Sequence, residues 1–391
     1  MKCITGNKEL GMKEIVTRKD FKAILLLLVA VAFLSACSSD SDDRNRQKVS
    51  FKLQSYVREY QEVLPPSYAR NRVISWPDGF DVSDMNRNIG VFFTQAAAPA
   101  PTISQFIYSG GQWYSTFEME PTTYYLYGYI PYDRNISSSI SLLGGVGKTF
   151  ADGAVLTLSG MPCFTVNDVC VIVGVKKGTS STESNGNIVQ GKFDYTVNAE
   201  ENHVYLLFDH LYSGLKFSIK VDGEYNKLRT IKLKEMTMTL KAKNGTDPVK
   251  EKMNVTITLA KNGLETTPIQ SVTITPDGSS NDVEALSVYK TEAGEEDLTL
   301  LTTPVNLYAN FAPFDVTRFK FELVSTYDVF DKDGNLVRKD CEATNTLDIG
   351  NLFAVSDLNR GTMYTVNLTV NPTYLYVLSD PDLDNPTIKI E

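Results

Sequence analysis

The sequence is poor in the residues that most often carry chemistry. Its 391 residues include 2 histidines, 2 tryptophans and 5 cysteines. No Gly-x-Ser-x-Gly motif surrounds a serine, which argues against a serine hydrolase. The two histidines are His203 and His210, so a metal site at His210 could draw on one further histidine, and no pair of cysteines has the spacing of metal ligands. We therefore predict no catalytic residues, no metal and no cofactor, although carboxylate pairs of the glycosidase kind are too common here to be singled out or dismissed.

The sequence also lacks a basic excess. Its formal net charge is -9, and the first 36 residues hold six Lys/Arg and three Asp/Glu, so residues 37–391 carry -12. So acidic a chain is repelled by phosphate backbones, so we expect no nucleic-acid partner.

No apolar run is long enough to span a bilayer, which takes about 20 residues. The longest has twelve, Ala23 to Leu34, behind a basic stretch. This pattern predicts a secretory signal peptide over 1–36. Leu34-Ser35-Ala36-Cys37 resembles a bacterial lipobox, so we expect lipidation of Cys37 and a flexible polar tether over 37–47; the alternative is an ordinary signal peptide with an incidental cysteine.

Cysteines are too few for a disulfide framework. Beyond Cys37 the exported part holds Cys163, Cys170 and Cys341. A bridge between Cys163 and Cys170 is compatible with an oxidising compartment, and buried free thiols are equally compatible with the apolar segment around Cys163. The sequence leaves both open.

Long helical periodicity is absent, and alternation of apolar and polar residues takes its place. It recurs at Phe217–Val221, Val255–Leu259, Phe319–Leu323 and Val366–Val370. Strands with one apolar face must pack in pairs of sheets. We predict an all-β chain with two β-sandwich domains in tandem, at 48–199 and 200–391.

A set of segments shares its order and spacing with a known family: 89–93, 111–113, 124–132, 158–162 with Asp168 behind it, 208–217 and 361–364. In this order and spacing they resemble the fimbrillins, the lipoprotein pilins of Gram-negative anaerobes. Read from the residues alone, Tyr125, Tyr127 and Tyr129 share one face of a strand that ends at Pro131. His210 is expected to hydrogen-bond a nearby backbone group.

The resemblance implies transthyretin-like or immunoglobulin-like sandwiches that assemble by protease-triggered strand donation. Residues 48–57 fit a removable first strand, with Phe51, Leu53 and Val57 on one side. Arg58, Arg70 and Arg72 are candidate cleavage positions, with Arg70 or Arg72 preferred because Pro65-Pro66 precedes them. We expect residues 49–57 to form an edge strand, since a strand paired on both sides would leave donation no entry point.

The C-terminal run is ambiguous. Residues 374–377, Tyr374, Leu375, Tyr376 and Val377, are β-prone and precede an acidic, proline-containing tail. They fit a donor strand for a neighbouring subunit, and equally the last strand of their own sandwich.

Together these features predict a structural component of cell-surface fimbriae: a pilin, tip or anchor subunit. Its partners would be other fimbrial subunits and the outer membrane, through lipid on Cys37, with host surfaces or glycans as further possible contacts. The alternative is an outer-surface, glycan-binding lipoprotein of a nutrient-uptake system that stacks sugars on Trp76 or Trp113. An enzyme is not expected.

Overall fold

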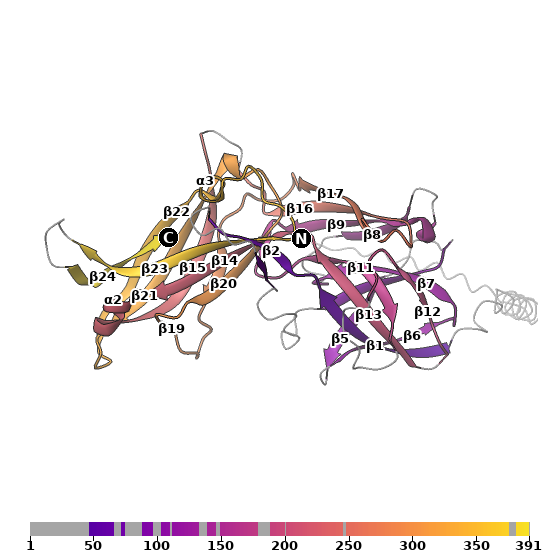
Figure 1. Ribbon diagram of the computed structural model, residues 1–391, viewed down its shortest axis with the longest axis horizontal. Helices are drawn as coiled ribbons and strands as arrows, with labels where there is room; N and C mark the ends of the chain where they lie inside the picture. The colour runs from indigo at the N-terminus through magenta and orange to yellow at the C-terminus, as the bar shows by residue number, and fades with distance from the viewer. Residues whose placement is uncertain are drawn as a thin grey trace, which may run out of the picture.

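The structure is a computed structural model that describes residues 47–65, 72–74, 88–96, 103–109, 112–132, 139–145, 149–178, 188–199, 201–244, 248–374 and 381–390. Strands dominate these residues, as the alternation predicts, so the all-β fold is confirmed. Four sheets group into two lobes (Figure 1).

The first lobe is built around an eight-stranded sheet that closes on itself, because β11 pairs with both β13 and β7. We call it the closed sheet. Its strands, in spatial order, are β11 (Cys170–Lys177), β13 (Glu201–His210), β1 (Gln47–Val57), β6 (Gln112–Met119), β5 (Ile103–Ser109), β4 (Ile89–Thr94), β7 (Thr123–Ile130) and β12 (Asp194–Thr196). The side chains that face inward, among them Phe51, Phe106 and Leu206, form one buried cluster.

A four-stranded sheet covers the outside of the closed sheet. It contains β17 (Ile269–Pro276), β16 (Lys252–Leu259), β9 (Ala154–Pro162) and β8 (Ser139–Gly144), followed by the 3₁₀ turn η4 (Phe150–Asp152). Tyr127 and Tyr129 of β7 belong to the same buried cluster as Leu156 and Leu158 of β9. The two faces of β7 therefore serve two cores, with tyrosines outward and Leu126 inward, as the sequence predicts.

The second lobe packs a seven-stranded sheet against a five-stranded one. The former contains β10 (Phe164–Thr165), β20 (Val305–Phe311), β14 (Ser213–Val221), β23 (Thr362–Tyr374), β2 (Tyr60–Val63), β3 (Arg72–Ile74) and β24 (Pro381–Ile390). The latter contains β18 (Leu286–Lys290), β15 (Thr230–Ala242), β21 (Phe319–Phe330), β22 (Leu336–Leu347) and β19 (Leu298–Leu300). The short elements α2 (Gly223–Leu228), η6 (Val316–Arg318) and α3 (Ile349–Phe353) connect these strands.

The alternating segments supply the cores as expected. Apolar positions of 217–221, 255–259, 319–323 and 366–370 are all at most 5 % exposed. Each strand hides one face, which is the arrangement that the period of two dictates.

The expected boundary at 199/200 does not divide the sheets. The strand β13 lies beyond it and yet pairs with β1 and β11 of the first lobe. β16 and β17 also follow it, and β16 pairs with β9. Figure 1 shows β16 and β17 beside β8 and β9. After β13 the chain thus leaves the first lobe, returns to it, and leaves again. The alternation within each strand does not show to which lobe that strand belongs.

Candidate functional site

The beginning of the described chain joins the two lobes. β1 runs parallel to β13 in the closed sheet, and two residues later β2 runs parallel to β23 in the second lobe. We call residues 47–63 the N-terminal ribbon. It completes a sheet in each lobe. The expected first strand is therefore part of a segment that connects the two lobes.

The expectation of an edge strand is wrong. β1 pairs with β13 over Ser50–Val57 and with β6 over Gln47–Leu53, so Ser50–Leu53 is bonded on both sides. Phe51 and Leu53 point inward as predicted, each 1 % exposed, and Val57 packs at the margin of the same cluster. A parallel strand inserted between later strands cannot be recognised from its own residues, because its neighbours are fixed by chain topology.

The candidate cleavage residues differ in setting. Arg58 is hydrogen-bonded rather than open: its amide donates to the Phe208 carbonyl at 2.9 Å, and its carbonyl accepts from His210. Arg72 lies in β3, where its backbone is in register with that of Glu62 in the antiparallel strand β2. Arg70 lies outside the described residues.

A buried polar network fixes the point where the ribbon crosses between lobes. Tyr60 donates its hydroxyl hydrogen to Asp168 Oδ1 at 2.7 Å, and Asp168 Oδ1 lies 3.0 Å from His210 Nδ1. The Tyr60 ring stacks on the His210 ring with centroids 3.5 Å apart. Cys170 Sγ is 3.3 Å from the same Nδ1. We call these four residues, with Arg58, the junction network.

His210 carries a positive charge in this arrangement. Its Nε2 lies 2.6 Å from the Arg58 carbonyl, which can only accept, so Nε2 bears a hydrogen. Burial opposes charging His210, but the Asp168 carboxylate and its hydrogen bond raise the pKa of the imidazole above its usual value. Burial likewise opposes the charge on Asp168, while the His210 charge and the bonds from His210 and Tyr60 hold the pKa of that carboxyl below its usual value. Both shifts favour the charged forms of the pair, an imidazolium and a carboxylate.

The network also tests the expectation of no metal and no catalysis. Asp168, Cys170 and His210 lie close enough to hold an ion among themselves. However, both His210 nitrogens already face acceptors, and burial beside Asp168 raises the pKa of the Cys170 thiol far above its usual value. Sγ and the carboxylate share Nδ1, whereas a Cys-His-Asp triad places them on opposite ring nitrogens. The donor set fits an ion pair better than a metal or a nucleophile.

A second charge contact flanks the first. The Asp209 carboxylate lies 3.3 Å from Arg58 Nη1 and 3.3 Å from Arg360 Nη1. Arg360 also donates to the His210 carbonyl at 3.0 Å. The ribbon, β13 and the turn before β23 therefore meet at one carboxylate.

Further along the ribbon, β2 carries a buried acid. Glu62 is 0 % exposed, and its Oε1 accepts from Thr365 Oγ1 at 2.6 Å and from Lys216 Nζ at 3.3 Å. Lys216 lies on β14 and Thr365 on β23, so one carboxylate connects three strands. An ion pair so buried fixes register, because no other alignment of β2 would neutralise the lysine.

The C-terminal strand is occupied within its own lobe. Tyr374 ends β23, and Leu375, Tyr376 and Val377 lie outside the described residues. The following strand, β24, pairs with β23 over Leu368–Tyr374. Tyr225 and Tyr327 each donate to a backbone carbonyl of β24, at 2.8 and 2.9 Å.

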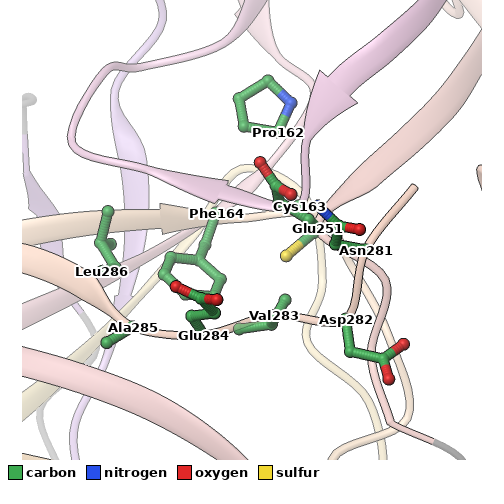
Figure 2. Close-up of a pocket in the computed structure, with 10 residues that line it drawn as sticks. All are labelled: Pro162, Cys163, Phe164, Glu251, Asn281, Asp282, Val283, Glu284, Ala285 and Leu286. Atoms are coloured by element: carbon green, nitrogen blue, oxygen red, sulfur yellow. The ribbon is translucent and has the colours of Figure 1, made fainter.

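Cys163, Cys170 and Cys341 are free and buried, which settles the open question of the Cys163–Cys170 bridge. Burial raises the pKa of the Cys163 thiol to about 12. This thiol borders a cavity of about 350 Å³ (Figure 2) whose lining includes Phe164, Glu251 and Glu284. Together with Asp282, the two glutamates place three carboxylates on its wall, which makes it unlike an apolar ligand pocket.

Of the two tryptophans proposed for sugar stacking, the structure describes Trp113, and it offers no exposed face. Trp113 is 3 % exposed and belongs to the interior of the closed sheet. Trp76 lies outside the described residues, as does Cys37. Among the helices that are described, none is long and apolar enough to cross a membrane.

Sequence reasoning noticed Asp168 and His210 but missed Tyr60, Glu62 and Lys216. A signal for Glu62 existed: it follows Tyr60 at the strand period and so sits on the same face as a buried aromatic residue. Its partners lie 154 and 303 positions away, a separation at which sequence gives no pairing information.

Solved structures that match this chain include candidate cell adhesion proteins and a fimbrial anchor protein. A candidate cell adhesion protein from Bacteroides fragilis is 9 % identical, with 87 % of this chain and 96 % of that chain covered and a TM-score of 0.39. A second, from Bacteroides uniformis, is 10 % identical, with coverage of 85 % and 97 % and a TM-score of 0.36. The fimbrial anchor protein Mfa2 from Porphyromonas gingivalis is 9 % identical, with coverage of 88 % and 97 % and a TM-score of 0.25.

Of these three neighbours, Mfa2 is the one described as a fimbrial protein. No family model matches the chain, and no curated protein sequence matches it. Because every TM-score quoted is below 0.5, the functional proposal rests on the geometry of this chain.

Proposed function

We propose that this chain is a structural subunit of cell-surface fimbriae, exported and tethered to the outer membrane through lipid on Cys37. Its partners are other fimbrial subunits, and its body is a scaffold rather than an enzyme. The observation that carries the proposal is the N-terminal ribbon, which completes a sheet in each lobe from one end of the chain.

A ribbon of this kind suits replacement rather than addition at an edge. β1 is bonded on both sides over Ser50–Leu53, so its departure would leave a slot flanked by β6 and β13 with two unpaired ladders. Exposed backbone groups and the apolar positions of Phe51 and Leu53 would favour refilling by another extended strand. Strand donation here therefore requires that the ribbon first be cut free.

The choice among the three candidate cleavage positions follows from the bonding of Arg58 and Arg72. The Arg58 carbonyl is bonded to His210, and Arg72 is within a strand. We therefore retain Arg70 as the preferred cleavage position. A cut there would free both β1 and β2 together.

Exchange of the ribbon tests the proposal. Residues 66–71 are replaced by a site-specific protease sequence in the full exported chain, which is cut and mixed with an isotope-labelled peptide of residues 47–65. Native mass spectrometry should show the labelled peptide replacing the original fragment in the cut protein and no uptake by the uncut protein. A cut protein that never exchanges its fragment would refute strand replacement.

The tether has its own test. Wild-type protein from a Gram-negative host should carry the mass of a lipid on its first residue, and a Cys37→Ala variant should lack it. An unmodified Cys37 peptide in the membrane fraction would contradict lipid anchoring.

A further inference from the structure

The slot left by the N-terminal ribbon has a chemical preference, an inference that rests on the proposed replacement of that ribbon. Lys216 is 8 % exposed, and Glu62 is the carboxylate paired with it among the residues that the structure describes. If β2 leaves and another strand takes its place, the Lys216 ammonium group beside Thr365 is buried again. An uncompensated buried charge strongly disfavours any strand that does not neutralise it.

The junction network adds a second requirement two residues earlier. The Tyr60 hydroxyl donates to Asp168 and accepts from Asn310 Nδ2 at 3.2 Å, while its ring covers the charged imidazole of His210. A replacing residue needs both an aromatic face and a hydroxyl to make these contacts. Positions 60 and 62 share one face of β2, so the two requirements fall on one strand.

We infer that the slot selects a partner strand carrying tyrosine and, two residues later, a carboxylate, placed beyond an apolar alternating segment that fills the closed sheet. Tyr60-Gln61-Glu62 is the only Tyr-x-Glu or Tyr-x-Asp in the sequence. The C-terminal tail offers none, and its strand β24 begins at Pro381 and contains a second proline, Pro386. Within this sequence only the ribbon itself meets both requirements, so we infer that the strand that refills the slot is not the C-terminal tail of a second copy.

Peptide competition on the cut protein tests this preference. The labelled N-terminal fragment is displaced by unlabelled peptides of residues 47–65 with the native sequence, Glu62→Gln, Tyr60→Phe or the control Gln61→Asn, whose side chain is exposed. Removal of one member of a buried ion pair should weaken Glu62→Gln by about 100-fold, and loss of the hydroxyl should weaken Tyr60→Phe by about tenfold. The Gln61→Asn peptide should match the native one, and a peptide of residues 371–390 should displace nothing.

The outcomes separate this inference from the proposed function. If the native and Glu62→Gln peptides exchange equally, the preference is absent although replacement occurs. If no peptide exchanges, replacement itself fails and the preference falls with it. In a Lys216→Met acceptor the two peptides should agree within about threefold, since the charge that distinguishes them is gone.

Discussion

The ion pair between Asp168 and His210 should be a major source of stability, and Asp168→Asn tests it. The substitution preserves shape and one acceptor oxygen, but it removes the charge that balances a buried imidazolium. It also weakens the acceptor of the Tyr60 hydroxyl. Removing one member of a buried pair costs about 3–5 kcal/mol, and the oxygen that remains argues for the lower end, about 3 kcal/mol.

Urea unfolding measures this loss. With an m value of about 3 kcal/mol/M, a loss of about 3 kcal/mol lowers the midpoint by about 1 M. The matched control is Asp384→Asn, which breaks the pair with Arg229, where the carboxylate is 53 % exposed. That change should lower stability by less than about 1 kcal/mol. Equal losses for the two variants would refute the charged state of the junction network.

The pH profile gives an independent check on the same pair. The pKa of Asp168 is lowered on folding, so its contribution is present above the usual value of 3.8 and disappears as the pH falls through the folded value. The pKa of His210 is raised, so its contribution is present below 6.5 and disappears as the pH rises through the folded value. Without the carboxylate, burial opposes the charge on His210, so the Asp168→Asn variant should lose less stability than wild type as the pH rises above 6.5 and should begin to lose stability at a higher pH than wild type on acidification. An unchanged profile would contradict the assignment.

Three other experiments test the fold and the site. Gly128→Ala places a methyl carbon 2.1 Å from the Gly90 carbonyl oxygen, so it should lower the free energy of unfolding in urea by about 3 kcal/mol. In the control Gly223→Ala the new methyl carbon meets no atom within 4 Å, so the free energy of unfolding should change by less than about 1 kcal/mol. Equal effects of the two substitutions would argue against the β4–β7 register. Thiol reagents should modify Cys163, Cys170 and Cys341 only after denaturation, and a Cys163–Cys170 peptide in a non-reducing map would contradict the free thiols. In limited trypsin treatment followed by peptide mapping, the Arg58–Glu59 bond should stay intact at early times. The Arg58 carbonyl is hydrogen-bonded to His210, so this segment cannot readily enter a protease active site in an extended conformation. Early cutting at this bond would overturn our preference for Arg70.

Local patterns in the sequence predicted the local structure well. Alternation identified the buried faces of β14, β16, β21 and β23, and the tyrosines of β7 fell on one side as their spacing requires. These features depend on neighbours along the chain, which the sequence displays directly.

Features that depend on distant segments could not be predicted in this way. β1 looks the same at an edge or between two strands, since its inward face is apolar in either case. The return of β16 and β17 to the first lobe leaves no mark on their alternation. His210 did bond a backbone carbonyl as expected, but its carboxylate and phenol partners come from segments 42 and 150 positions away.

The insertion of β1 between two strands determines how the body bears tension. A pull at Gln47 acts along the strand, so it loads the bonds to β6 and β13 simultaneously instead of opening them one after another. The hydrogen-bonded ribbon then continues into the second lobe as β2. There Glu62 opposes sliding of the strand, because sliding would separate its carboxylate from the Lys216 ammonium group. Forced extension from the first strand should thus unfold both lobes only at high force, and single-molecule pulling that showed gradual peeling at low force would contradict this mechanical role.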